Sequence, residues 1–541
     1  MMRFVQAPAG GVSRKPQALQ YVPDMRIALA ASLAFLPAAC GQPTAGPVEI
    51  ALIDGGPVVP DAGAVKKGGI SVAPLAPVLV GATRAGLVGF DAEGRIVPAL
   101  AERWIVTDDG LGYIFRLRDG VWNDGTPIAA PDVVSALRRT FADLHDRDLA
   151  RDLPTVRAIK VMARRVIEID LDAPQPDFLT LLAQPELGIG AGPHGQHEAG
   201  MMDVRREGDG IVASLVAPDH PGLPLQPPPA SERPLAIRNA PAQLAIDRFV
   251  AGKVDLVLGG TYDTVPLAER VGAARGSLQL DPVPGLFGLD VTATQGFLAD
   301  PANREAVAMA IDRDKLVAAF GVNGWQATTR LVTAGLEGDP GLVGERWADL
   351  PLDQRRTQAA VRVAGWIKAH APASVAPVGG QNGVQVQAQG AFAPPVLLIA
   401  LPDGPGAALI FEHLHDDLAG IGLDLRRAAV GQGADLVLLD TVARYPRPRW
   451  FLQRMSCAAH PVGCSQEGDA DLAQALSSPD PVAAGGLLAD AEAKITAANG
   501  FIPLARPLRW SLVRSGLAGF SVNAIGWHAL VPLAASETVG N

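Results

Sequence analysis

Leu87 to Asp132 reads LVGFDAEGRIVPALAERWIVTDDGLGYIFRLRDGVWNDGTPIAAPD, and this stretch decides the fold because it holds an ordered series of turns and apolar runs. Asp91-Ala92-Glu93-Gly94 and Asp108-Asp109-Gly110 are turn sequences. Two more reversals follow at Asp119-Gly120 and Asn123-Asp124-Gly125. The segment is therefore expected to be a set of short elements joined by tight turns, and none of its residues is catalytic by itself.

The elements between these turns can be assigned from periodicity. From Tyr113 to Leu117 every second side chain is large and apolar, which is the period of a half-buried strand. Pro98 predicts a short helix over Ala99 to Trp104, and Ala130-Pro131-Asp132 predicts the first turn of a longer helix.

Two later regions carry equally clear patterns. The alanine-rich stretch from Asn303 to Phe320 predicts one long amphipathic helix. Val396 to Leu401, Ala407 to Ile421 and Leu423 to Leu425 predict strand, helix and strand. If these form a βαβ unit, the two strands are parallel and the crossover is right-handed. The protein is expected to be α/β.

Composition limits the class of function. The chain has 541 residues, of which 48% are hydrophobic and 19% charged, values typical of a globular protein with a sizeable core. The formal net charge is -10, which argues against nucleic acid as a partner because phosphates would be repelled. Small solutes and neutral partners remain open.

Motifs of catalysis and metal binding are missing from the sequence. It contains no H-E-x-x-H, no G-x-S-x-G, no P-loop and no complete dinucleotide fingerprint. His413 and His415 are two residues apart and point to different faces of a helix, so a solvated face is the better interpretation than a metal site. We expect no enzyme activity, no cofactor and no metal.

The 87–132 stretch resembles the signature of the family 5 extracytoplasmic solute-binding proteins of ABC transporters, which include dipeptide, oligopeptide and nickel binders. The residues that carry the resemblance here are Leu100-Ala101-Glu102, Trp104, Leu117-Arg118, Asp124-Gly125-Thr126-Pro127 and Asp132-Val133. Further matches to the family pattern are Gly190 to His194, Lys253 to Leu256, Ala310 to Arg313 and Ile502-Pro503-Leu504. Their order and spacing make the resemblance specific, although each motif alone is weak.

The resemblance implies a two-lobed periplasmic-binding-protein-like fold of type II, similar to the large cluster C proteins, with the ligand cleft between the lobes. Lobe I would comprise residues 80–284 plus 506–541, and lobe II residues 285–505, after a tether and first strands at 41–79. The crossing segments would lie near Pro282 to Leu289 and Gly500 to Pro507. Ligand capture would occur by hinge closure.

Residues 1–40 have the pattern of a secretory signal. Met25-Arg26 precedes the apolar run Ile27 to Pro37, which is too short to span a bilayer, and then Ala38-Ala39-Cys40. The residues before Met25 do not fit this pattern, which favours Met25 as the start. The end of the run also resembles a bacterial lipobox, which implies a lipid on Cys40, although Pro37 stands where leucine is usual. The alternative is an ordinary cleaved signal with a free Cys40.

Cys457 and Cys464 form an even pair separated by a short loop that contains Pro461 and Gly463. In an oxidising compartment such a pair is a candidate disulfide, and the peptide binders that this chain resembles often carry a bridge in this lobe. A zinc site would need further ligands, and only His460 lies between the two cysteines.

The segment 443–448, Ala-Arg-Tyr-Pro-Arg-Pro, is similar to the family's cleft loop, commonly W-x-A-D-Y-P-D-P. In peptide binders of the family an acid of the cleft holds the ligand's α-ammonium. Here arginines replace both acids and Thr441 replaces the tryptophan. The resemblance therefore implies ligand contacts from Thr441, Arg444, Tyr445 and Arg447, and the arginines would favour an anionic or carboxylate-bearing solute.

The alternative for these arginines is that they face solvent or pair with Asp435 or Asp440 while the ligand is held elsewhere. Five tryptophans are candidates for stacking in the cleft and equally for the core: Trp122, Trp325, Trp450, Trp510 and Trp527.

The resemblance implies a protein that binds and releases a solute without altering it. The chain would be the periplasmic, lipid-anchored solute-binding component of an ABC importer, a monomer that passes a small solute, most commonly a peptide, to permease subunits. One alternative keeps the fold and binds an anionic or carboxylated non-peptide solute. Another is an envelope lipoprotein with a sensor or structural role and no transport.

Overall fold

The computed structural model describes residues 46–53, 76–144, 148–153, 155–270, 276–370, 393–429 and 432–536. The predicted signal segment, the expected start at Met25 and the predicted lipidation site Cys40 lie outside these residues. Within the described ranges no helix combines the length and the apolar character needed to cross a membrane.

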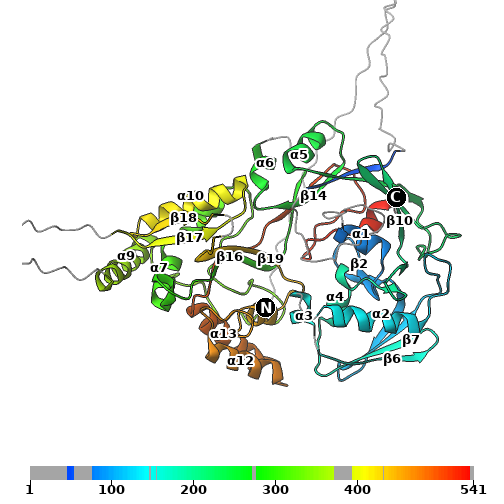
Figure 1. The fold of residues 1–541 in the computed structure, drawn as a ribbon, viewed down its shortest axis with the longest axis horizontal. Coiled ribbons are helices and arrows are strands. Elements are labelled where there is room, and N and C mark those ends of the chain that lie inside the picture. The colour runs from blue at the N-terminus through cyan, green and yellow to red at the C-terminus, as the bar shows by residue number, and fades with distance from the viewer. Residues whose placement is uncertain are drawn as a thin grey trace, which may run out of the picture. The chain divides into compact units, whose positions relative to one another are not determined.

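A seven-stranded mixed sheet holds strands from both ends of the chain (Figure 1). In spatial order its strands are β10 (Met202–Glu207), β11 (Gly210–Leu215), β13 (Leu235–Ala240), β1 (Val48–Ile53), β14 (Leu256–Thr261), β21 (Arg509–Val513) and β15 (Leu278–Asp281). β1 is parallel to both β13 and β14. This central strand is almost wholly buried, as expected for an apolar strand covered on both faces.

A five-stranded sheet is built from the later part of the chain. Its order is β18 (Asp424–Arg427), β17 (Val396–Ala400), β19 (Leu436–Val442), β16 (Gly285–Val291) and β20 (Phe501–Ala505). β17 and β18 are parallel and are joined through α10 (Pro405–Ala419), which confirms the βαβ unit predicted from sequence.

The stretch that decided the sequence interpretation forms a smaller four-stranded antiparallel sheet in the order β4 (Ala101–Val106), β5 (Gly112–Leu117), β7 (Val166–Leu171) and β6 (Val156–Ala163). β5 matches the predicted alternating strand, and α2 (Ala130–Asp143) begins at the predicted Ala130 with proline in its first turn. The predicted helix over Ala99 to Trp104 is wrong, because these residues enter β4, where Trp104 pairs with Phe115.

The predicted long helix over Asn303 to Phe320 is two helices, α7 (Pro301–Ala310) and α8 (Arg313–Ala318). Asp312 causes the break, because its side chain accepts a hydrogen bond from the backbone nitrogen of Lys315 and so caps α8. Its own backbone nitrogen is 2.8 Å from the carboxylate of Asp417 on α10.

The other helices pack on these sheets or on one another. They are α1 (Ala76–Thr83), α3 (Asp148–Asp152), α4 (Phe178–Leu182), α5 (Ala242–Val250), α6 (Val265–Arg270), α9 (Leu352–Ala369), α11 (Pro448–Arg454), α12 (Gln466–Ser477), α13 (Pro481–Ala497) and α14 (Leu530–Ala534). α12 and α13 lie side by side (Figure 1). Three two-stranded pairs complete the described part: β2 (Val88–Phe90) with β3 (Ile96–Pro98), β8 (Gly190–Ala191) with β9 (His197–Glu198), and β12 (Ser231–Glu232) with β22 (Ala535–Ser536).

The chain passes between the two large sheets at two places. Residues 282–284 connect β15 of the first sheet to β16 of the second, and residues 506–508 connect β20 of the second sheet to β21 of the first. A buried ion pair joins the sheets beside these crossings, with both carboxylate oxygens of Asp440 at 2.9 Å from Nη1 of Arg509. The two crossings therefore bring neighbouring strands β16 and β20 together at the junction.

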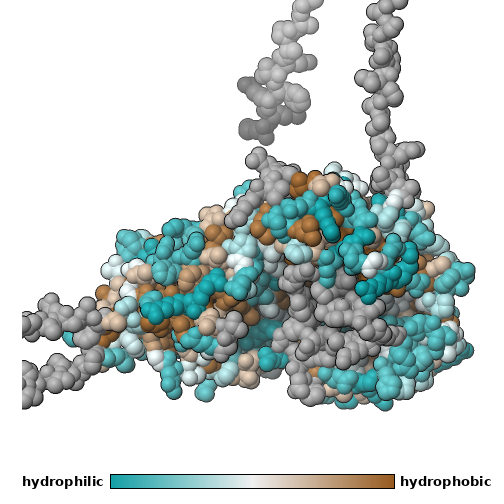
Figure 2. All heavy atoms as spheres, turned by 45° about the horizontal axis from the view of Figure 1, so that its top comes forward, coloured by the Kyte–Doolittle hydropathy of each residue, from teal (hydrophilic) through white to brown (hydrophobic). Residues whose placement is uncertain are grey.

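The hydrophobic core has a part that joins distant segments. One buried cluster contains side chains of the four-stranded sheet, including Phe115 and Ile167. The same cluster contains Tyr445, which follows β19, and Trp450 and Phe451 of α11. On the surface, Figure 2 shows hydrophilic residues over much of the visible face with hydrophobic residues between them. The strongly exposed apolar side chains include Val482 on α13 and Leu342 in a loop.

Candidate solute-binding site

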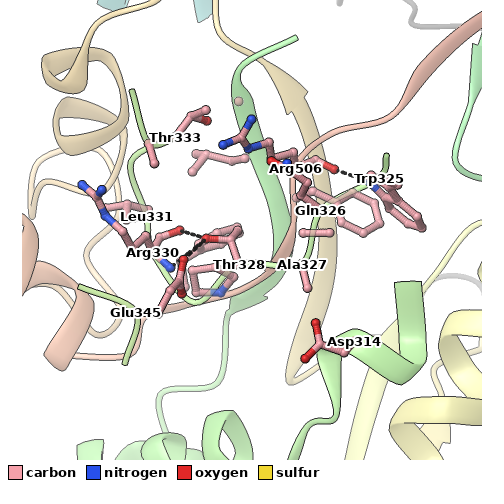
Figure 3. Close-up of a pocket in the computed structure, with 17 residues that line it drawn as sticks. Asp314, Trp325, Gln326, Ala327, Thr328, Arg330, Leu331, Thr333, Glu345 and Arg506 are labelled. Carbon is pink, nitrogen blue, oxygen red and sulfur yellow. Dashed lines mark hydrogen bonds between the residues drawn. The ribbon is translucent and has the colours of Figure 1, made fainter. Parts of the chain in front are cut away.

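A cavity of about 390 Å³ lies beside the two crossings (Figure 3). The start of β16 and the end of β20 form one wall, and Arg506 extends from the crossing segment that follows β20. The loop from Trp325 to Ala334 forms the facing wall. The cavity is thus bounded by both strands that lead from one sheet to the other.

Backbone hydrogen bonds hold the 325–334 loop against β20. Thr328 donates its backbone N–H to Leu504 at 3.1 Å, and Ala327 bridges to Ala505. Arg506 donates its backbone N–H to Gln326 at 3.1 Å and accepts the indole N–H of Trp325 at 2.7 Å. These contacts fix the backbone on both sides of the cavity.

A buried charge cluster anchors the loop from behind. Nη2 of Arg330 is 2.7 Å from Oε2 of Glu492 on α13 and 3.0 Å from Oδ1 of Asp339. Glu492 also accepts the backbone N–H of Val332 at 3.1 Å. Burial raises the pKa of Glu492, which shows that desolvation outweighs the attraction of Arg330 there. The charge of Arg330 is therefore used within the protein and is not available to a solute.

Three other charged side chains line the cavity. The carboxylate of Glu345 accepts hydrogen bonds from the backbone nitrogen of Thr329 at 2.7 Å and from the hydroxyl of Thr328 at 3.2 Å. Asp314 lies exposed in the first turn of α8, where its charge favours the helix N-terminus. The guanidinium of Arg506 has no side-chain hydrogen bond or ion pair with any described residue. It is the charged group at this cavity with unused donors.

The arginines of the 443–448 segment are already paired. Arg444 Nη1 is 2.7 Å from Oε1 of Glu186, and its Nε is 3.5 Å from Oδ2 of Asp152. Arg447 reaches two other acids, with Nε 3.2 Å from Asp177 Oδ1 and Nη1 2.7 Å from Glu337 Oε1.

Neither arginine lines the cavity, and neither pairs with the acids named from the sequence. Asp440 binds Arg509, and Asp435 accepts the backbone nitrogen of Leu398 at 2.8 Å. The sequence could not identify the actual partners, because these acids lie more than 100 residues away along the chain.

The other two residues expected at the ligand occupy different places. Tyr445 is fully buried in the core, and its hydroxyl is 3.2 Å from Oε1 of Gln453. Thr441 stands directly opposite Leu286 in the β16–β19 ladder, and Leu286 lines the cavity. Of the five candidate tryptophans, Trp325 lines the cavity, and Trp122, Trp450 and Trp510 are buried in the core. Trp527 is partly buried and packs against the core cluster that contains Trp122.

Cys457 and Cys464 are joined as a disulfide with Sγ atoms 2.16 Å apart. Among the described residues no group of three or more histidine, cysteine, aspartate or glutamate side chains is placed to hold a metal ion. His413 instead contacts the backbone oxygen of Leu409 at 3.0 Å within its own helix.

Part of the sequence matches a model of a known protein family. Residues 95–203 match the model of the bacterial extracellular solute-binding proteins, family 5, middle region. The match bears out the resemblance to this family over residues 95–203. The matched segment contains the four-stranded sheet and α2, and most of the residues of the 87–132 stretch that carried the resemblance lie within it.

Curated family 5 relatives match over part of their length. The probable deoxycholate-binding periplasmic protein YgiS of Escherichia coli is 37% identical over 120 residues, which are 19% of this chain and 22% of the relative. The glutathione-binding protein GsiB of Escherichia coli is 27% identical over 254 residues, 43% of this chain and 47% of the relative. The chain therefore aligns with less than half of the length of either relative.

The fold extends over nearly the whole chain. The crystal structure of Haemophilus influenzae OppA in complex with RPPGFSPFR superposes with a TM-score of 0.68 at 15% identity, covering 90% of this chain and 98% of that one. At this identity the likeness shows the fold, which confirms the periplasmic-binding-protein architecture expected from the family 5 resemblance.

Proposed function

We propose that this protein is the extracytoplasmic solute-binding component of an ABC importer. It captures one small solute between a lobe of residues 80–284 plus 506–541 and a lobe of residues 285–505. It then closes by a hinge motion and delivers the solute to permease subunits without altering it.

The observation that carries this proposal is the cavity between the crossing strands and the 325–334 loop. β16, β20 and the loop belong to the second proposed lobe, and Arg506 begins the second segment of the first. A solute held there contacts both sides of the junction, so binding and lobe closure are coupled. Ligand sites are common at such junctions between domains.

The size of the cavity favours a small solute. Its volume of about 390 Å³ is near the lower end of the range of about 300–1,000 Å³ that is usual for small-molecule sites. A short peptide is the default in this family, and a compound of similar size such as glutathione, which a relative is named for binding, is the natural first candidate.

The 443–448 segment has a supporting role in this proposal. Thr441 remains a candidate ligand contact because it neighbours Leu286 across the strand ladder. Arg444, Tyr445 and Arg447 would act from behind the site by joining the proposed lobes through ion pairs and core packing.

The cellular setting follows the family. The protein would reach the periplasm through a signal within residues 1–40, be held at a bacterial membrane by a lipid on Cys40, and act as a monomer beside its permease. Labelling cells with a radioactive fatty acid, comparing wild type with Cys40→Ser, tests the anchor directly.

Two measurements on the mature protein test solute binding. The first is mass spectrometry of small molecules released by denaturing the purified protein. The second is thermal unfolding with di- to pentapeptides, glutathione, deoxycholate and small carboxylates. A solute at one hundred times its dissociation constant should stabilise the folded state by about 2.7 kcal/mol. The proposal fails if no compound co-purifies and none raises the melting temperature at millimolar concentration.

A further inference from the structure

Arg506 is the cation of the site that has no hydrogen-bond or ion-pair partner for its side chain among the described residues. Figure 3 shows its side chain extending toward Thr333 across the space in front of the 325–334 loop. It is half-buried, so part of its hydration is lost, yet no described carboxylate or carbonyl accepts a hydrogen bond from its guanidinium. Arginines that are partly removed from water usually gain a partner in return.

The acids around Arg506 are engaged elsewhere. Glu345 is held by Thr328 and Thr329, and the two acids behind the loop are held by Arg330. Asp314 lies at the far end of the labelled residues in Figure 3. It stands in the first turn of α8, where the partial positive charge of the helix N-terminus stabilises its carboxylate. The unused donors of Arg506 are therefore open to a group from outside the chain.

The backbone presents this side chain from a rigid support. The N–H and C=O of Arg506 are both hydrogen-bonded to the facing loop. Buried Ala505 precedes it and buried Pro507 follows it, so the φ angle of the next residue is fixed. A preorganised guanidinium loses little conformational freedom when it binds a ligand.

We infer that Arg506 receives a carboxylate of the solute, which makes it the residue that selects for acidic ligands. The inference rests on the proposed function and adds the chemical class of the solute. A planar guanidinium matches a carboxylate through two parallel hydrogen bonds. A phosphate dianion fits less well, because one free arginine would have to balance two charges in a cavity whose lining also includes Asp314 and Glu345.

The test uses matched pairs of compounds that differ in one charge. Trialanine is compared with trialanine amide, N-acetyltrialanine with its amide, and glutarate with glutaramide, by calorimetry and thermal shift on the mature protein. The wild type should bind the acid of at least one pair about tenfold or more tightly than its amide. Arg506→Gln should bring that ratio close to one, and Arg506→Lys should retain part of it.

Two controls separate the site from a general effect of charge. Asp314→Asn removes a charge of opposite sign at the same cavity and should not reduce the preference for the acid. Arg95→Gln removes an arginine that is 73% exposed and distant in sequence, and should leave all affinities unchanged. The melting temperature of Arg506→Gln without ligand should be close to that of the wild type, because the guanidinium makes no hydrogen bond or ion pair with a described residue that the substitution could remove.

The outcomes separate the inference from the proposed function. If the wild type binds panel compounds but does not prefer any acid to its amide, the inference is wrong and the solute-binding function stands. The same holds if the preference survives in Arg506→Gln. If the wild type binds none of these compounds and nothing co-purifies with it, both are overturned.

Discussion

Replacing Arg444 with methionine should destabilise the fold rather than merely remove a ligand contact. The Arg444 side chain is 14% exposed and its partner Glu186 is 5% exposed, with 2.7 Å between the charged atoms. The second oxygen of Glu186 has no hydrogen-bond partner, so its carboxylate depends on this arginine. Removing one member of a buried pair typically costs about 3–5 kcal/mol, because a charge is left without compensation.

Asp152 should contribute less to this loss. After Arg444 is removed, Oδ2 of Asp152 still has Nη2 of Arg454 at 3.0 Å. Glu186 is therefore the only one of the two acids whose charge is left unpaired. We therefore expect a loss of about 3 kcal/mol for Arg444→Met. Adding Glu186→Gln removes the stranded charge and should recover most of that loss.

Urea unfolding followed by tryptophan fluorescence measures these changes. Arg426→Met serves as a control because it breaks an ion pair in which the arginine is 62% exposed, and the expected loss is at most about 1 kcal/mol. The reasoning is refuted if Arg444→Met is within about 1 kcal/mol of wild type, or if Glu186→Gln does not restore the double variant. A variant with normal stability and lost solute binding would instead make Arg444 a ligand residue.

Three further predictions concern the second half of the chain. Burial alone would lower the pKa of His460, but its hydrogen bond and charge interaction with Asp290 outweigh this and raise the pKa above 6.5. The stabilisation from this pair is complete below pH 6.5 and is lost as pH rises through the raised value, so urea midpoints should fall over that range in the wild type and less in His460→Gln. Reduction of the Cys457–Cys464 bond, which closes a loop with a sequence separation of 7, should lower stability by about 2–3 kcal/mol, measured with and without reductant; an unchanged midpoint would contradict it. Arg330→Met should cost about 3–5 kcal/mol in thermal unfolding because Asp339 and Glu492, 4% and 3% exposed, lose their shared cation, and a loss near zero would show that water reaches them.

Local pattern predicted the elements whose sequence and tertiary surroundings agree. β5 and α2 are examples, because the alternation after Tyr113 and the proline and acid after Ala130 suit the places those residues occupy. Ala101–Val106 shows the opposite case. Alanine and glutamate favour a helix, but pairing with β5 imposes a strand and leaves Ile105 65% exposed.

The candidate site was less predictable, because the pairing of charges is decided in three dimensions. Arg444 and Arg506 look alike in sequence, and both stand beside proline-containing segments. Acids more than 250 residues away bind Arg444, whereas no described side chain pairs with Arg506. The nearest sequence signal to Arg506 was the Ile502-Pro503-Leu504 match, which ends two residues before it.

The position of the cavity beside residues 282–284 and 506–508 has a mechanical consequence. Any rotation of one large sheet against the other occurs about these two segments, so the solute lies near the hinge axis. Displacement under rotation grows with distance from the axis. Contacts at the solute therefore move little while the outer ends of both halves sweep through a wider arc. A partner that touches only those outer ends could distinguish a loaded protein from an empty one without reaching the solute.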